Sequence, residues 1–418
     1  IIVLKLRNKL IVMKKIFFIL FLLSFLLSSC QKLSNVLGIN FDSSLTYPNM
    51  SMENRYFYAD YRKQGDRLYN FYKIAEYDKL IVYVKEGSGY NQESVNYIAN
   101  EFNNNYDEEV RIYGEHTDVD KNGKIIILLL ELNASYSGSI TTGYFYGADL
   151  ILNQNNNAEI LYMDIKKVNE DPEYMSGTIQ HEFQHLINFN VNYIENGREI
   201  STWLNEALSE STSILFSPTI VSSRINEFNN HMSGYYCFYT WNLPLNNIFA
   251  NYPSVSVFVN WLYKRNGNNS SVFQNIAKYS SAEDYSRVLN NVSFIGSSSW
   301  EDLLLKWIEG LKNNEVAGAK LQIQPSESTI SLFPGAAVAY SGSIEPSGNL
   351  VIKDLGNGYQ VALNKDTYIG NNPTYINITT PKVSSVQASK MYETANDKPY
   401  TPKEIPVLFD KDGKIKEY

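Results

Sequence analysis

Two histidines four residues apart, with a glutamate beside the first, are the residues of this sequence best suited to chemistry. In a helix each residue turns by about 100°, so His181 and His185 would project within about 40° of each other, next to Glu182. One metal ion could bind both imidazoles while Glu182 acts as a base on a water molecule. Four histidines and 44 acidic residues among 418 give this pattern by chance roughly 0.004 times per chain. The pattern therefore favours a zinc site over two unrelated core or surface histidines.

A helix with clear boundary signals is expected to hold this pair. Asp171 is a natural N-cap, Pro172 suits the first turn, and Ile179 and Leu186 can face a core. These signals predict a helix over residues 172–189. The histidines would therefore stand on a rigid element.

A catalytic zinc ion usually has three protein ligands and one open position, so a third ligand is needed. In one branch of the zinc enzymes whose two histidines have this spacing, the third ligand is a further histidine that follows a glycine. Asn188 stands at the glycine position and Val191 at the histidine position here, which excludes that arrangement. Another branch takes a glutamate from a second helix, and we predict Glu206 in this role. Glu195 and Glu199 are competing acids, but they lie around an Asn-Gly turn rather than on a helix.

The second helix is expected over residues 203–216, with Thr202 as its cap and Ser217–Pro218 at its end. Glu206 and Glu210 would share one of its faces at i,i+4 spacing. A carboxylate hydrogen-bonded to the far nitrogen of a ligating histidine fixes the tautomer of that histidine, and we assign this position to Glu210. The alternative is that both glutamates line a solvated helix face.

The segment HEFQH, followed 21 residues after His185 by the glutamate of NEALSE, resembles the zinc-binding segments of the thermolysin-like gluzincins. Within that clan the sequence is most similar to the hyicolysin family, which residues 118–124, 143–145 and 158–164 also support. The similarity extends over about residues 55 to 270.

This resemblance implies an α+β, zincin-like metallopeptidase that acts on proteins or peptides. It implies one Zn²⁺ held by His181, His185 and Glu206, with Glu182 as the general base. The rival hypothesis is a surface adhesin or binding lipoprotein that keeps this fold without catalysis. Zinc chemistry alone also leaves open the hydrolysis of a different bond.

Peptide hydrolysis also needs a donor for the developing oxyanion, and we predict Tyr252. It precedes an expected helix over residues 254–265, which resembles the arrangement in related aminopeptidases, although Val255 replaces a small residue there. The alternative is that Tyr252 only packs, as amphipathic aromatic residues often do. His231 and Tyr235 are the fallback donors.

A polar run before one expected strand has the spacing of a calcium loop. Asp118, Asp120, Asn122 and Gly123 fit this spacing, but the twelfth position holds Leu129 instead of glutamate, which excludes an EF-hand. We expect a polar turn here, with an irregular Ca²⁺ site as the alternative.

The beginning of the chain has the pattern of an export signal. Residues 16–23 form a short apolar run after Met13 and two lysines, and small residues follow. The run is shorter than the roughly 20 residues that a membrane-spanning helix needs. Residues 1–12 lie upstream of a plausible start at Met13, and we interpret them as a mis-assigned gene start.

The run Leu27 to Cys30 resembles the bacterial lipobox. That resemblance implies that residues 1–29 are removed and that Cys30 is acylated. The protein is then expected in the cell envelope, anchored to a membrane and facing the periplasm or the exterior. Cys237 would be the one remaining thiol, so no intramolecular disulfide is expected.

The composition indicates a folded protein of several parts. A hydrophobic content of 44% can build a large core, while a net charge of -8 and a pI near 5.3 argue against nucleic-acid binding. The predicted parts are a signal peptide (1–29), a lipid-anchored linker (30–54), a mixed α/β part (55–170), a helical zinc part (171–318) and a β-rich domain (319–418).

Local patterns give the remaining elements of these parts. Strands are expected at 79–85, 124–132, 158–165, 349–352 and 375–378, and further helices at 93–102 and 299–312. The strand at 158–165 either lies at a sheet edge, where an extended peptide substrate could pair with it, or is buried inside the sheet.

Overall fold

The structure is a computed structural model that describes residues 44–137, 140–151, 155–231, 234–241, 248–325, 327–370, 372–381 and 404–408. The predicted signal peptide and Cys30 lie outside these residues. Within the described ranges, no helix combines the length and the apolar character that crossing a membrane requires.

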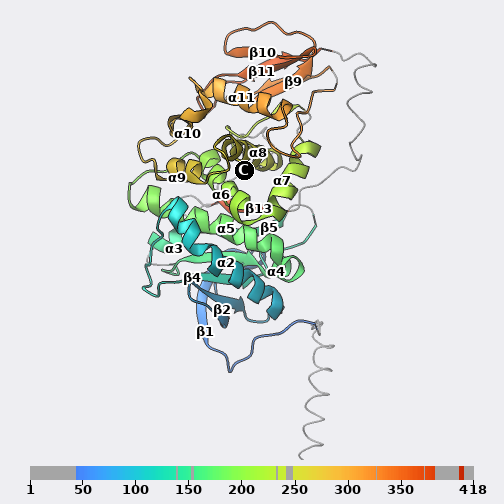
Figure 1. The fold of residues 1–418 in the computed structure, drawn as a ribbon. Coiled ribbons are helices and arrows are strands. Elements are labelled where there is room, and N and C mark those ends of the chain that lie inside the picture. The colour runs from blue at the N-terminus through green and yellow to red at the C-terminus, as the bar shows by residue number, and fades with distance from the viewer. Residues whose placement is uncertain are drawn as a thin grey trace, which may run out of the picture.

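A seven-stranded mixed sheet forms the N-terminal part, at the bottom of Figure 1. Its central strands β3, β4 and β6 are parallel to one another, and the flanking pairs β1–β2, β2–β3 and β5–β6 are antiparallel. In sheet order the strands are β1 (Asn54–Ala59), β2 (Arg67–Glu76), β3 (Leu80–Lys85), β4 (Ile125–Leu130), β6 (Ile160–Asp164), β5 (Ile140–Phe145) and β13 (Glu404–Leu408).

Strand β4 shows why this sheet is covered on both faces. All six of its residues are apolar and buried, which is typical of a parallel strand between two packed layers. Ile127 and Leu129 belong to the core on the helical side, while Ile126 and Leu128 belong to a second core on the opposite side.

Strand β6 corresponds to the expected strand at 158–165, and it is not an edge strand. It pairs with β4 through Ile127 and Leu161 and with β5 through Tyr144 and Tyr162. The chain forms β5 before β6 and then returns between β5 and β4, an order that spacing along the sequence does not reveal. The hypothesis that a substrate pairs with the 158–165 strand is therefore wrong, and the buried alternative is correct.

Helices cover one face of the sheet and continue upward as a second layer in Figure 1. Helix α5 packs against α2, α6 and β5 and is therefore the central element of this layer. The helices are α2 (Gln92–Tyr113), α3 (Ala148–Ile151), α4 (Ile165–Glu170), α5 (Pro172–Asn188), α6 (Thr202–Phe216), α7 (Pro218–His231), α8 (Ile248–Arg265), α9 (Ser271–Lys278), α10 (Tyr285–Asn291) and α11 (Trp300–Lys312). Three short turns, η1 (Tyr61–Lys63), η2 (Phe189–Ile194) and η3 (Ser293–Ile295), complete the set.

Helix α5 begins where the signals in the sequence predicted. The Asp171 side chain accepts a hydrogen bond from the Tyr174 N–H at 3.2 Å, and Pro172 occupies the first turn. Every residue from Met175 to Asn188 is buried. The helix then passes into the π-helical turn η2, because no stop signal follows Asn188.

Two predicted helix starts need correction. Helix α6 begins at Thr202 with Ser201 in the N-cap position, so Thr202 is not the cap. Helix α8 begins at Ile248, six residues before the expected start, so Tyr252 lies inside it and not ahead of it. Proline usually interrupts a helix by removing an N–H. Around Pro253 the burial of neighbouring side chains outweighs that effect.

Two smaller sheets form the C-terminal part, with the larger one at the top of Figure 1. The larger has the order β10 (Leu350–Gly356), β11 (Tyr359–Asn364), β9 (Ala337–Ser341) and β7 (Tyr235–Tyr236). The smaller pairs β12 (Ile376–Thr379) with β8 (Thr329–Leu332). Helix α11 packs against both β10 and α8. One continuous core therefore joins this sheet to the helical layer.

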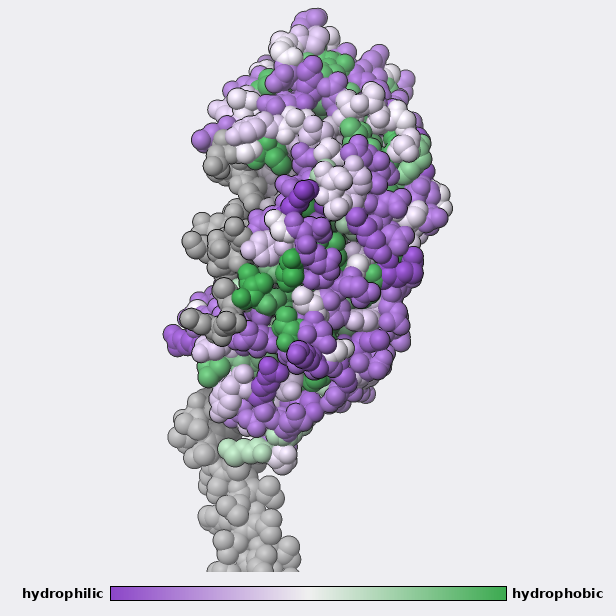
Figure 2. Space-filling model, turned by 90° about the vertical axis from the view of Figure 1, so that its left-hand side faces the viewer, coloured by the Kyte–Doolittle hydropathy of each residue, from purple (hydrophilic) through white to green (hydrophobic). Residues whose placement is uncertain are grey.

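On the face shown in Figure 2, hydrophilic residues predominate and hydrophobic residues gather at mid-height. Cys237 is buried in the core beside the C-terminal sheets, as expected for a small apolar side chain.

A glycine sets the distance between α5 and α7. A Cβ atom at Gly177 would lie 2.6 Å from Ile220 Cδ1 and also too close to the Ser217 side chain. Real Cβ atoms do not approach other atoms so closely, so the two helices can touch here only because residue 177 has no side chain.

Candidate metal centre

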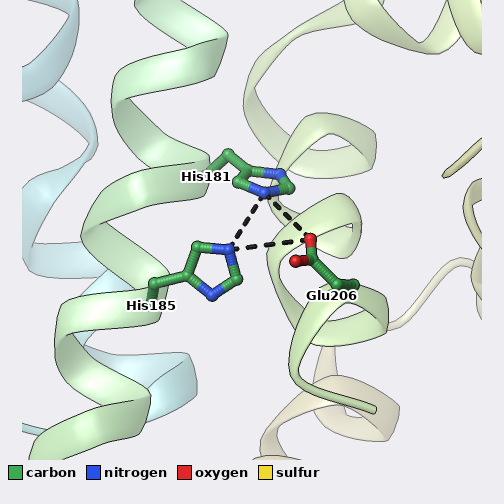
Figure 3. A group of neighbouring side chains, drawn as sticks. All are labelled: His181, His185 and Glu206. Carbon is green, nitrogen blue, oxygen red and sulfur yellow. Dashed lines mark hydrogen bonds and ion pairs between the residues drawn. The ribbon is translucent and has the colours of Figure 1, made fainter. Parts of the chain in front are cut away.

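Three side chains from α5 and α6 point toward one another in the helical layer (Figure 3). His181 Nε2 lies 3.1 Å from His185 Nε2 and 3.4 Å from Glu206 Oε2, and His185 Nε2 lies 3.7 Å from the same oxygen. All three residues are buried, and Glu206 is 0% exposed. We call His181, His185 and Glu206 the metal triad.

The spacing of the metal triad fits a tetrahedral zinc ion. Zinc binds histidine nitrogen and carboxylate oxygen at about 2.0–2.2 Å, so two ligand atoms of a tetrahedron lie about 3.3–3.6 Å apart. The three separations of 3.1, 3.4 and 3.7 Å scatter around this value. Two imidazoles and one carboxylate are also a ligand set that catalytic zinc sites use.

The far nitrogen of His185 is held by two residues of α6. Its Nδ1 lies 3.1 Å from Asn205 Oδ1 and 2.9 Å from Ser209 Oγ. The Ser209 hydroxyl donates its own proton to Gln184 Oε1 at 2.5 Å, so its oxygen is left to accept. Both contacts favour a proton on Nδ1, which leaves Nε2 with its lone pair toward the centre of the triad.

The far nitrogen of His181 faces Glu210. Its Nδ1 lies 3.5 Å from Glu210 Oε1, and Arg224 of α7 binds both oxygens of Glu210, at 2.8 and 2.9 Å. Arg224 also contacts Glu227 at 3.1 Å. A bidentate arginine fixes the plane of a carboxylate, so Arg224 orients Glu210 toward His181.

Burial excludes the solvated-face alternative for Glu206 and Glu210, since both are 0% exposed. Glu195 and Glu199, the competing acids, are exposed, and Glu195 accepts a hydrogen bond from Asn190 at 2.9 Å. Glu206 is the acid that joins the two histidines.

Glu182 follows His181 directly and is fully buried. Neither of its carboxylate oxygens has a side-chain hydrogen-bond partner among the described residues. Burial raises its pKa, while the neighbouring imidazoles and a contact with the Phe145 backbone act in the opposite direction. A buried carboxylate with a raised pKa and no side-chain partner is suited to accept a proton from a small molecule beside it.

The charges of the triad are strongly coupled. Burial would raise the pKa of Glu206, but attraction to His185 and hydrogen bonding to His181 outweigh it and lower the pKa to about 2. For His185, burial acts to lower the pKa, but Glu206 raises it above its ordinary value. The site therefore stabilises positive charge at its centre.

Tyr252 lies beside the triad, on α8. Its ring centroid is 6.3 Å from that of His181, and the Arg224 guanidinium lies 5.1 Å from the Tyr252 ring centroid. Of the fallback donors, Tyr235 lies in β7 and donates to Ser331 O at 3.3 Å, among the C-terminal strands. The His231 side chain lies outside the described residues.

Sequence reasoning missed three residues that hold the triad in place. Asn205 directly precedes Glu206 and Ser209 directly precedes Glu210, and their i,i+4 spacing could have placed both on one helical face. Arg224 had no comparable signal, because its partner Glu210 lies on another helix and only the packing of α6 against α7 brings them together.

No protein-family model matches this chain. Over 193 residues it is 30% identical to the neutral metalloprotease ShpI of Staphylococcus hyicus, an alignment that covers 43% of this chain and 44% of that protein. The chain thus matches less than half of the length of this relative. The similarity supports a relationship to metallopeptidases, in agreement with the metal triad.

Proposed function

We propose that this protein is a zinc metallopeptidase that hydrolyses peptide bonds in proteins or peptides. The observation that carries the proposal is the convergence of His181, His185 and Glu206 next to the buried carboxylate of Glu182, which has no side-chain partner among the described residues. The similarity to a neutral metalloprotease supports the choice of a peptide bond.

In this proposal the metal triad holds one Zn²⁺. When bound, zinc would polarise a water molecule and the scissile carbonyl. Glu182 removes a proton from the attacking water and delivers it to the leaving amine. Its raised pKa suits both steps, because the same group must accept a proton and then release it.

Two further residues support this chemistry in the proposal. Tyr252 donates a hydrogen bond to the oxyanion, since its ring lies beside His181. Glu210, held by Arg224, fixes the orientation of His181 through the nitrogen that faces away from the triad.

We further propose that the enzyme is a lipoprotein of the cell envelope, anchored to a membrane through an acylated Cys30. The lipobox-like residues Leu27 to Cys30 support this proposal. Labelled fatty acid should be incorporated into the wild-type chain in a bacterial host but not into the Cys30→Ser variant. Equal labelling of both chains would contradict the anchor.

Metal analysis combined with a protease assay tests the function. Purified residues 31–418 should contain one zinc ion per chain and should cleave casein or a peptide library. A zinc chelator should abolish cleavage, and added Zn²⁺ should restore it. A preparation that binds one zinc ion but cleaves neither substrate would instead support the binding lipoprotein.

A further inference from the structure

A second group of potential metal ligands lies away from the metal triad, at the end of the N-terminal sheet where strands β4 and β6 begin. Carboxylate oxygens of Asp118, Asp120 and Glu159 all lie within 4.8 Å of one another. We call these three residues the acidic cluster. Asp118 and Asp120 belong to the turn before β4, and Glu159 directly precedes β6.

Glu159 distinguishes this cluster from ordinary surface acids. It is 1% exposed, and its Oε1 accepts a hydrogen bond from the Val119 N–H at 2.8 Å. Its Oε2 is buried and has no hydrogen-bond partner among the described residues. A buried carboxylate oxygen that lacks a partner is unfavourable unless a cation or a donor occupies the space beside it.

The charged side chains around the cluster do not provide a partner for Glu159 Oε2. Among the described residues, the one cation paired with the cluster is Arg55, whose Nη1 lies 3.7 Å from Asp120 Oδ2 and whose side chain is partly exposed. Lys124 is close in sequence, but it binds Glu76 and the Tyr77 carbonyl instead. Burial and the neighbouring Glu159 carboxylate raise the pKa of Asp120, as expected for acids held together without a matching charge.

From this geometry we infer that the acidic cluster binds one calcium ion. Calcium takes oxygen ligands at about 2.3–2.6 Å, so two of its ligands can lie up to about 5 Å apart, which accommodates three carboxylate oxygens that all lie within 4.8 Å of one another. It also accepts carbonyl and water oxygens in a flexible arrangement, which suits a site partly open to solvent. Magnesium requires a tighter octahedron and keeps most of its waters.

In the acidic cluster, Glu159 takes the place of the glutamate that an EF-hand has at its twelfth position. That position holds Leu129, which is buried in β4. Glu159 instead supplies a carboxylate from the start of the neighbouring strand, and it reaches the loop through the Val119 N–H, 40 positions away in the sequence. A calcium ion here would tie the turn to the starts of β4 and β6 and would stabilise the sheet.

Calcium binding to the zinc-loaded full chain tests this inference. The protein is freed of calcium on a chelating resin, its zinc content is verified, and Ca²⁺ or Mg²⁺ is titrated while heat release and Tm are measured. We expect one Ca²⁺ per chain, a Kd below about 10⁻³ M, a Tm that rises with Ca²⁺, and weaker binding of Mg²⁺. No saturable binding at about 10 mM Ca²⁺, well above that Kd, would overturn the inference, and Mg²⁺ binding as tight as Ca²⁺ would overturn the choice of calcium.

Glu159→Gln keeps the shape and the hydrogen-bond acceptor of the side chain but removes its charge. It should weaken calcium binding at least about tenfold and remove the calcium-dependent rise in Tm, with zinc content unchanged. Asp118→Asn, at an exposed position, should also weaken binding and decides the question if Glu159→Gln fails to fold. Asp78 is an exposed acid that precedes β3 at the same end of the sheet. Asp78→Asn is therefore the matched control and should bind calcium like the wild type. Unchanged calcium affinity in both cluster variants would overturn the assignment.

Discussion

The metal triad and the acidic cluster each bring three ligands together, but on opposite kinds of scaffold. The triad stands on two packed helices, is buried throughout and offers two nitrogens and one oxygen. The cluster offers only oxygens, and the exposure of its residues runs from buried Glu159 to exposed Asp118. Zinc accepts nitrogen ligands in a fixed tetrahedron, whereas calcium accepts oxygen ligands in variable number. The donor atoms of the two groups therefore suit different metals, with nitrogen and oxygen suited to zinc and oxygen alone suited to calcium.

The two regions also differ in how they support their ligands. Each histidine of the triad has a partner on its far nitrogen, and one of those partners is itself held by Arg224. In the acidic cluster, backbone N–H groups of the loop support the carboxylates, as with Gly123 N to Asp118 Oδ1 at 3.0 Å. We expect substitutions around the triad to change chemistry and substitutions in the cluster to change stability.

The largest expected effect on activity comes from Glu182→Gln, and the same change in the acidic cluster is expected to have none. Glu182→Gln should retain one zinc ion and the wild-type Tm, but it should reduce kcat by about 10²–10⁴, the contribution of a general base. Glu159→Gln, the same change in the acidic cluster, should leave kcat near the wild-type value once the protein is folded. Zinc analysis and casein hydrolysis on both variants measure the contrast. Undiminished activity of Glu182→Gln would remove this residue from the mechanism.

Tyr252→Phe is expected to have the next largest effect. Loss of an oxyanion donor typically lowers kcat by about 10²–10³, with little change in KM. Tyr263→Phe on the same helix is the control, because that ring stacks on Phe273 away from the triad. If Tyr252→Phe were no slower than Tyr263→Phe, Tyr252 would be only a packing residue.

Glu210→Gln should act through zinc affinity. Loss of a partner behind a ligating histidine typically weakens metal binding by about 10–100-fold. Glu227→Gln is the matched control, since Glu227 also binds Arg224 but does not contact His181. Competition with a fluorescent zinc chelator gives the two affinities. Equal zinc affinities for the two variants would show that Glu210 holds α7 in place without orienting His181.

The last prediction concerns stability and not activity, at a buried acid whose hydrogen bonds only partly offset its burial. Asp149 accepts hydrogen bonds from Tyr162 at 2.6 Å and Asn156 at 3.1 Å, and burial raises its pKa to about 7. The folded state then binds more protons than the unfolded state between about pH 4 and pH 7, so the free energy of unfolding should fall as pH rises through this range. Asp149→Asn should remove this decrease in the free energy of unfolding, which amounts to up to about 4 kcal/mol.

Chemical unfolding of the wild type and Asp149→Asn at several pH values tests this expectation. The two stability curves should lie close together near pH 4 and diverge toward pH 7. Parallel curves would mean that Asp149 is ionised over the whole pH range, and that the hydrogen bonds it accepts from Tyr162 and Asn156 outweigh the effect of burial.

Sequence analysis was most successful where the relevant interactions lie within one helix. The i,i+4 spacing of His181 and His185 and the cap at Asp171 are local properties, and the structure has both. The choice of Glu206 over Glu195 depended on expecting a helix in one segment and a turn in the other. Burial separates these two acids in the same way.

It was least successful where packing between distant segments decides the outcome. Arg224 reaches Glu210 because α7 packs against α6, and Glu159 reaches the acidic loop because β6 pairs with β4. The earlier start of α8 was missed because Pro253 is a strong local signal that tertiary packing overrides. None of these contacts leaves a periodic pattern in the sequence.

The contact at Gly177 links three positions in a way that matters for the evolution of this protein. Gly177 lies one helical turn before His181, and Ser217 and Ile220 fill the space where its side chain would be. A larger residue at position 177 is compatible with the same helix spacing only if smaller residues appear at both 217 and 220. Among relatives these positions should therefore change as a group, and a designer who alters one of them must redesign the other two.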